Sequence, residues 1–428
     1  MIPPLEQLRT RLAQAIDDAD EQGHDVGDLR DQLASLRTIG EAADVAGRLA
    51  QAPMRPDWPY VEPDDLQAIR AESDPSRATG AIGSPDPSRI RDAFIARVCG
   101  CMLGKGFEVF VGLDEIRSAL EANGEWPLRD YPTEKALRAL PSLQGQWREL
   151  ARERITHVAV DDDINYTILA MLTLESHGAG FTHDDMRALW LYNLPVLATF
   201  GPERTMLIAS AIATLEGGGS ALHINPGAEL CGALIRADAY GYACMGRPEL
   251  ASELAHRDAS FTHRRTGVYG AMFVAAAIAI APFVDDRLEI FREALRFVPQ
   301  NSRFAERTRA GIEIVENADD WLEAHAKIRD RFGDFGFCRI YQEIGMVINS
   351  VRFASDPGDG ICIQVMQGLD TDSFAATAGS ILGAHLGPID RRWVRPFNDD
   401  VRTALASFHE RSLSAIAARM AALPERVS

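Results

Sequence analysis

Three consecutive carboxylates, Asp161, Asp162 and Asp163, stand in the stretch AVDDDINYTI between an apolar dipeptide and a segment with the pattern of an amphipathic helix. Asp is a favoured N-cap, and acids in the first turn of a helix are stabilised by the helix dipole. Capping accounts for one or two of these residues. A divalent cation would account for all three, because hard cations collect carboxylate oxygens and offset their repulsion. The stretch alone leaves both interpretations open.

A second polar group, Asp370, Asp372 and Ser373, opens another predicted helix in the stretch QGLDTDSFAATAGSILGAHLG. Small residues follow it at four-residue spacing: Ala375, Gly379, Gly383 and Gly387. Such a row lowers helix propensity but lets a second helix approach closely, so it needs a packing reason. Together the two groups supply five carboxylates and a hydroxyl, which suit two octahedral Mg²⁺ or Mn²⁺ ions. We therefore expect both groups to converge on one site, with two cations about 4 Å apart.

Helical segments that would position these groups fill most of the chain. Residues 85–428 are rich in Ala and Leu, are interrupted by Gly and Pro, and contain no sustained alternation that would require a sheet. We predict an all-α main domain over this range. Residues 1–84 are predicted to form a helical N-terminal extension and a linker, because apolar residues at helical spacing give way to four prolines in QAPMRPDWPYVEPDD.

The composition of the 428-residue chain, 46% hydrophobic and 25% charged, is typical of a globular protein. A net charge of −18 without a basic stripe argues against nucleic acid as a partner. The six cysteines form no CxxC pair, so we expect reduced thiols and no zinc–thiolate centre. The N-terminus lacks a secretory pattern, and we expect a cytoplasmic protein. The uncharged segment 266–284 approaches the length of a membrane span, but its Ala, Gly and Pro content favours a buried helix and no membrane partner.

Four stretches in this order resemble the ADP-ribosylglycohydrolase family, which includes glycohydrolases that activate dinitrogenase reductase. They are GCMLGKGFE (100–108), the acidic triplet, RDASFTHRRTGVYGAMFVAAAIA (257–279) and GLDTDS (368–373). The resemblance covers about residues 90–410, and GLDTDS is its most specific part. It implies an all-α fold with a binuclear Mg²⁺ centre, Mn²⁺ being an alternative, in a central cleft. The implied activity is hydrolysis of the N- or O-glycosidic bond between an α-linked ribose and its acceptor.

The resemblance also implies roles for individual residues. It assigns the metal ligands, of which Asp372 also belongs to the catalytic group: Asp161, Asp162, Asp163, Asp370, Asp372 and Ser373. Glu108 falls where the family has a glutamate that contacts substrate or moves a proton. Such a carboxylate suits the chemistry, because cleavage develops oxocarbenium character on the ribose while a water loses a proton. The alternative for Glu108 is a surface glutamate after the GKG turn.

Four further polar residues are candidates for substrate binding, each with a structural alternative. His263 resembles a family histidine near the substrate ribose or base, but a lone His before a buried helix also fits a structural role. Arg236 could meet a diphosphate or form an internal salt bridge to Asp238 or another acid. Tyr269 and Asn349 are possible polar contacts.

Two departures from the family pattern bear on the substrate. Asp161 stands where many members have Ser or Thr, which adds a negative charge to the metal ligands. The segment HINPGAELCG (223–232) stands where many members have a more glycine-rich loop around ADP-ribose. The sequence therefore predicts a metal-dependent hydrolase of an ADP-ribosylated protein or a smaller ribosyl conjugate. The alternative is a non-catalytic binding or structural member of the fold. The sequence leaves the acceptor, the recognition of diphosphate and adenine, and the oligomeric state undetermined.

Overall fold

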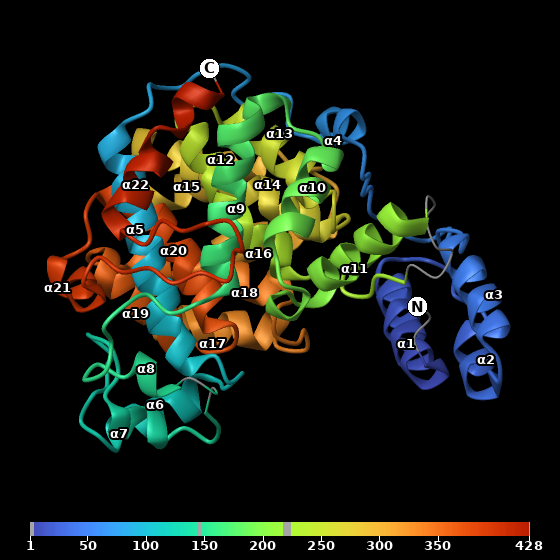
Figure 1. Cartoon of the computed structure of the whole chain (residues 1–428), viewed down its shortest axis with the longest axis horizontal. Helices are drawn as coiled ribbons and strands as arrows, with labels where there is room; N and C mark the ends of the chain where they lie inside the picture. The colour runs from blue at the N-terminus through green and yellow to red at the C-terminus, as the bar shows by residue number, and fades with distance from the viewer. Residues whose placement is uncertain (1–3, 144, 146, 217–223, 428) are drawn as a thin grey trace.

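The computed structural model describes residues 4–143, 145, 147–216 and 224–427, and within these ranges the chain is all-α, as predicted. The described ranges contain 22 α-helices joined by loops and short 3₁₀ turns. β-Structure in the described residues is limited to isolated bridges, such as Leu230 with Arg339. Figure 1 shows the helices gathered into one large body with a smaller N-terminal group at one end.

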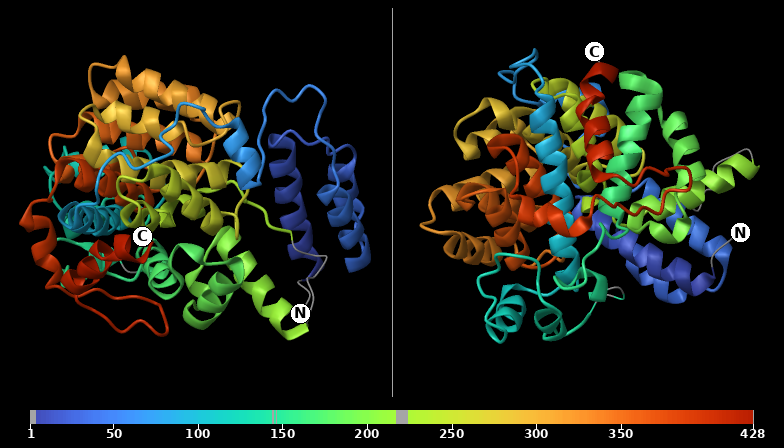
Figure 2. Two further views of the ribbon diagram at one scale, coloured as in Figure 1. Left: turned by 90° about the horizontal axis from the view of Figure 1, so that it is seen from above. Right: turned by 60° about the vertical axis from the view of Figure 1, so that its left-hand side comes forward.

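The smaller group is the N-terminal extension, and the helices of residues 4–50 expected from the sequence are present there. They are α1 (Leu5–Glu21), α2 (Leu29–Ser35) and α3 (Ile39–Ala50). Leu8, Leu12 and Ile16 of α1 are buried in an apolar cluster separate from the main core. Figure 2 shows this group beside the main body in both views. The boundary between extension and main domain, drawn from the sequence at residue 84, stays a prediction.

The centre of the main body is a close pair of helices, α5 (Pro87–Gly104) and α20 (Thr371–Leu386). A Cβ on Gly379 or Gly383 of α20 would lie 2.4 Å or 2.6 Å from a backbone oxygen of α5. Conversely, a Cβ on Gly100 or Gly104 of α5 would lie 2.1 Å or 2.2 Å from a backbone oxygen of α20. The row of small residues therefore has the packing reason that the sequence suggested, since only glycine lets the two backbones approach so closely.

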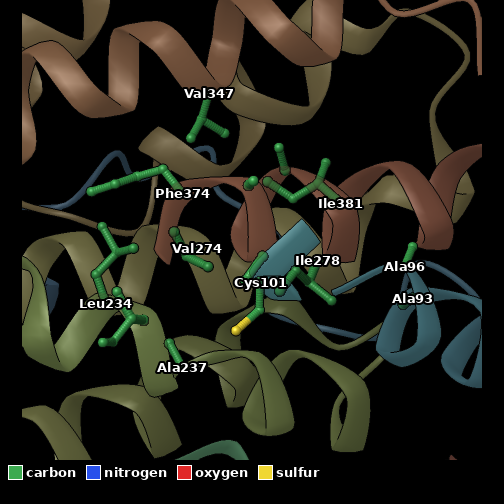
Figure 3. Close-up of a cluster of buried hydrophobic side chains, with 14 of the residues drawn as sticks. Ala93, Ala96, Cys101, Leu234, Ala237, Val274, Ile278, Val347, Phe374 and Ile381 are labelled. Atoms are coloured by element: carbon green, nitrogen blue, oxygen red, sulfur yellow. The ribbon is translucent and has the colours of Figure 1, made fainter. Parts of the chain in front are cut away.

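The apolar segment around residue 270 is α14 (Thr266–Ile280), and all of its residues are buried. Within the described residues, the stretch Thr266–Phe283 is the one helical segment with the length and composition of a membrane span, and 89% of it is buried inside the protein. A core helix passes the same test. Figure 3 shows Ile278 of α14 near Ile381 of α20, and Ala96 of α5 belongs to the same buried cluster.

The remaining helices lie around this central core. The first group is α4 (Leu66–Glu72), α6 (Leu113–Glu121), α7 (Glu134–Arg138), α8 (Trp147–Leu150), α9 (Asp162–His177), α10 (His183–Asn193) and α11 (Gly201–Glu216). The second is α12 (Asp238–Ala243), α13 (Pro248–Ala259), α15 (Arg287–Leu295), α16 (Arg303–Glu316), α17 (Trp321–Phe332), α18 (Ile340–Phe353), α19 (Pro357–Met366), α21 (Arg391–Val394) and α22 (Leu413–Ala421). Helices α9, α18 and α20 begin close to one another in space, and their first turns meet at the site described next.

Candidate metal centre and active site

The starts of α9 and α20 line one cavity of about 710 Å³. The two acidic groups, more than two hundred residues apart in the sequence, therefore converge as expected. The lining residues from these groups are Asp161, Asp162, Asp370, Asp372 and Ser373. Asp163 lies directly behind them, where its Oδ2 accepts a hydrogen bond of 3.1 Å from Ser373 Oγ.

At the start of α9, Asp161 caps the helix and Asp163 forms a buried ion pair. Asp161 is the N-cap, and its Oδ1 accepts a 2.9 Å hydrogen bond from the backbone N–H of Asp163. Capping therefore accounts for one oxygen of one residue. Asp163 is fully buried and forms an ion pair of 3.2 Å with Arg97 of α5, whose guanidinium also contacts Asp238 at 3.0 Å. Arg97 fixes the position of α9 against α5 through these buried pairs.

The start of α20 is fixed from two sides. Thr371 Oγ1 donates a 2.8 Å hydrogen bond to the carbonyl of Gly104, at the end of α5. Leu369, in a left-handed conformation with φ of 69°, donates its backbone N–H to Val111 at 2.8 Å. The side chain of Asp370, the N-cap residue, makes no capping bond, so the helix start does not use its carboxylate. The close approach of α5 and α20 thereby sets where the second acidic group lies.

Glu108 follows the 3₁₀ turn Lys105–Phe107 at the end of α5 and lines the same cavity. Its carboxylate shares a hydrogen bond with Asp372. Burial and the nearby charge of Asp161 raise the pKa of Glu108 to about 7. The structure thus places Glu108 in the wall of the cavity beside the acidic groups, rather than in a surface turn.

The carboxylates of the site repel one another. Burial, followed by the charges of neighbouring acids, raises the pKa of Asp162, Asp163 and Asp372 well above the usual range. Burial opposes ionisation of Asp161 too, but its ion pair with Lys105 outweighs burial and lowers its pKa. The extra negative charge that Asp161 adds is therefore neutralised by a lysine of the same chain, from the GKG stretch.

These residues fit a divalent cation by their chemistry. The donors are carboxylate oxygens and one hydroxyl, which are the ligands that Mg²⁺ and Mn²⁺ prefer. A bound cation would also offset the repulsion that raises the pKa values, because it stabilises the ionised carboxylates. The oxygens that could contact it directly belong to the five acidic-group residues that line the cavity, while Asp163 could act through Ser373.

The four residues predicted to bind substrate do not line this cavity, and all four are buried elsewhere. Arg236 contacts Glu203 at 2.5 Å and also pairs with Asp258, so the internal salt bridge weighed for it exists, but with these acids. His263 Nδ1 contacts the Thr262 hydroxyl at 2.7 Å. These buried side chains support the wall of the cavity, since Glu203 itself lines it.

The other two candidates, Tyr269 and Asn349, form hydrogen bonds within the protein. The Tyr269 hydroxyl donates to the carbonyl of Pro63 in the linker at 2.5 Å. Asn349 donates to the carbonyl of Trp321 at 2.8 Å and to the side chain of Gln367 at 2.7 Å. Each bond fixes a loop or a helix to its neighbour, and neither side chain reaches the cavity.

Several lining residues escaped the sequence analysis. Phe110 and Phe337 stack at the rim with ring centroids 4.0 Å apart, and about half of each side chain is exposed. Cys231 and Cys338 also line the cavity. No local spacing signals these residues, because they lie far apart in the sequence, in loops or, for Cys231, at the start of the 3₁₀ helix Cys231–Arg236. Exposed aromatic residues after a predicted helix are the only hint, and it does not distinguish a rim from any other surface.

Comparisons with known proteins bear on the family and the fold of the chain. The model of the family described as ADP-ribosylglycohydrolase matches residues 84–423. No curated protein matches the chain. Among solved structures, one described as an "ADP-ribosylglycohydrolase-related protein complex" is similar in fold, with a TM-score of 0.51 and 18% identity. The similarity covers 80% of this chain and 99% of that one.

Proposed function

Because the chain belongs to the ADP-ribosylglycohydrolase family, we propose that it is a metal-dependent hydrolase that cleaves the N- or O-glycosidic bond of an ADP-ribosyl or smaller ribosyl conjugate. One observation supports this proposal above the others. Two acidic groups and Glu108, from three separate parts of the chain, line a single cavity of about 710 Å³. A cavity of this volume can enclose a small-molecule ligand.

In the proposed site Asp162, Asp370, Asp372 and Ser373 bind two Mg²⁺ or Mn²⁺ ions together with one oxygen of Asp161. When bound, the cations polarise the ribose oxygens and lower the pKa of water in the site. Arg97 and the close α5–α20 contact keep the acids in place before substrate arrives. Lys105 compensates for Asp161, so the site tolerates an acid where many family members have a hydroxyl residue.

Glu108 is the proposed proton-transfer group. A carboxyl with a pKa near 7 exchanges protons readily at neutral pH, which is the property that general acid–base catalysis requires. Glu108 takes a proton from the attacking water and delivers it to the leaving group as the C1″ bond breaks. Its carboxyl lies beside that of Asp372, so the proton-transfer group and the acidic groups face the same part of the cavity.

The walls of the cavity constrain the substrate. Phe110, Phe337 and Phe200 offer exposed aromatic surface, which suits a planar base or an apolar acceptor. Lys105 is the single cationic side chain among the described lining residues, and its ammonium is already paired with Asp161. The lining therefore gives a diphosphate no cationic side chain of its own. Exposed aromatic side chains without an unpaired cationic side chain favour a substrate that is bound through its ribose and through an aromatic contact.

A turnover screen tests the proposal. Chelator-stripped protein is incubated with ADP-ribosylated protein and with small N- and O-ribosyl conjugates, with and without Mg²⁺ or Mn²⁺, and the released sugar product is measured. We expect metal-dependent release from at least one conjugate, and none with Asp372→Asn. Cation binding without turnover of any conjugate would instead favour the non-catalytic alternative.

A further inference from the structure

Two cysteines that are far apart in the sequence meet one carboxylate at the wall of the cavity. Cys231 Sγ lies 3.3 Å and Cys338 Sγ lies 3.2 Å from Oδ2 of Asp370. The two sulfurs and this oxygen all lie within 4.8 Å of one another. Cys231 is buried, whereas Cys338 is half-buried, and both line the cavity. Three donor atoms therefore surround one point that is reachable from the cavity.

The backbone around the two cysteines is tightly fixed. The N–H of Cys231 donates to the carbonyl of Cys338 at 3.1 Å, beside the antiparallel bridge between Leu230 and Arg339. Asp18 of α1 forms hydrogen bonds to both of the segments that carry these cysteines. Its oxygens accept the N–H of Gly227 at 2.6 Å and a guanidinium N–H of Arg339 at 3.1 Å. These bonds keep the sulfurs together without a covalent link.

A buried glutamate next to the sulfurs is incompletely satisfied. Glu343 of α18 accepts the N–H of Cys338 at 3.1 Å and that of Asp370 at 3.4 Å, both on Oε1. Its Oε2 is buried and has no hydrogen-bond partner among the described residues. A buried carboxylate oxygen without a partner is costly in a protein interior. A cation beside Cys338 and Asp370 would reduce that cost, because it supplies the missing positive charge.

From this geometry we propose that Cys231, Cys338 and Asp370 form a binding site for one thiophilic divalent cation, of the class of Zn²⁺ and Cd²⁺. Two thiolates and a carboxylate suit such soft or borderline cations, and water from the cavity completes a tetrahedral set. Mg²⁺ disfavours sulfur ligands, so the site differs from the proposed magnesium centre in the metal that it selects. Binding replaces two S–H protons, which leave to solvent, by two metal–sulfur bonds.

Occupation of this site has a consequence that rests on the proposed function. Asp370 belongs to both donor sets, so a cation bound between the sulfurs takes Asp370 away from the magnesium centre. Zn²⁺ and Cd²⁺ therefore act as inhibitors of the hydrolase, and the inhibition requires both cysteines. The test below measures binding alone, so a protein without turnover that still binds Cd²⁺ loses the proposed function but keeps this site.

The test is a Cd²⁺ titration of the reduced, chelator-stripped full-length protein, followed by the ultraviolet charge-transfer absorption of cadmium thiolates. We expect the absorption to saturate at one Cd²⁺ per chain, to be reversed by Zn²⁺, and to persist in excess Mg²⁺. Cys231→Ala and Cys338→Ala should each weaken binding by at least about 100-fold, because each removes a direct ligand. Cys362→Ala removes a fully buried sulfur of α19 and serves as the matched control, with parental binding.

Three results would overturn the site. The first is no cadmium–thiolate absorption in the reduced parent. The second is absorption of equal size and affinity in both ligand variants, provided that circular dichroism shows them folded. Because Cys338 is half-buried, Cys338→Ala remains informative even if Cys231→Ala fails to fold. The third is a Cys231–Cys338 disulfide that mass spectrometry still detects after treatment with excess reductant, which would make the pair a stable covalent crosslink.

Discussion

Replacement of Glu108 by Gln should stabilise the metal-stripped protein at high pH. The raised pKa means that the folded state binds this proton more tightly than the unfolded chain does. The contribution of the protonated carboxyl to stability is therefore complete below pH 4.5 and is lost as the pH rises through about 7. A rise in pKa from 4.5 to about 7 corresponds to about 3 kcal/mol at pH 8 and about 1 kcal/mol at pH 5. The neutral amide of Gln pays none of this cost.

Urea unfolding of parent and Glu108→Gln at pH 5 and pH 8, both stripped of metal, measures this difference. The free energy of unfolding of the variant should exceed that of the parent by about 3 kcal/mol at pH 8 and by much less at pH 5. Glu313→Gln, at an exposed position of α16, is the control and should show no such dependence on pH. A variant that gains nothing at pH 8, or gains equally at both pH values, would refute the account of Glu108.

Three further predictions concern catalysis, metal binding and packing. Glu108→Gln should lower turnover by about 10²- to 10⁴-fold and retain metal. Asp372→Asn should lose both metal and activity. Steady-state kinetics and metal analysis of both variants measure these outcomes. Mg²⁺ at 100 times its Kd should stabilise the stripped protein by about 2.7 kcal/mol, and a thermal scan without any shift would contradict this. Gly379→Ala should lower the free energy of unfolding by about 1–3 kcal/mol, because its Cβ would lie 2.4 Å from the Ala96 carbonyl oxygen. Gly47→Ala, whose Cβ would meet nothing within 4 Å, is the control and should not lower it, as urea unfolding of both variants would show.

The sequence predicted those parts of the candidate site whose residues are adjacent in the chain, namely the two acidic groups. Asp161 to Asp163 and GLDTDS each place acidic side chains and a helix start in one short stretch, so the sequence alone indicates where these acids lie. The glycine spacing of α20 likewise predicted a close helix contact, and α5 provides it. The all-α fold followed from the helical periodicity and the absence of alternating strands.

Long-range features could not be predicted in the same way. In the sequence Arg236 is a candidate ligand for a diphosphate and His263 for the substrate ribose or base. In the structure, burial pairs Arg236 with acids and places His263 against a hydroxyl of the protein interior. The two cysteines beside Asp370 are a second long-range feature. Cys231 and Cys338 lack any CxxC spacing, yet a backbone bridge between distant loops brings them to Asp370. Spacing reveals a thiolate site only when the ligands share one local segment.

The central claim, that the starts of α9 and α20 form a two-cation centre, is tested most directly by anomalous diffraction from crystals of the protein grown with Mn²⁺. The account predicts two manganese peaks about 4 Å apart, contacted by carboxylates of Asp162 and Asp372, and their loss in Asp372→Asn. The absence of manganese between these two helices, in a crystal where the cavity is open to solvent, would contradict it.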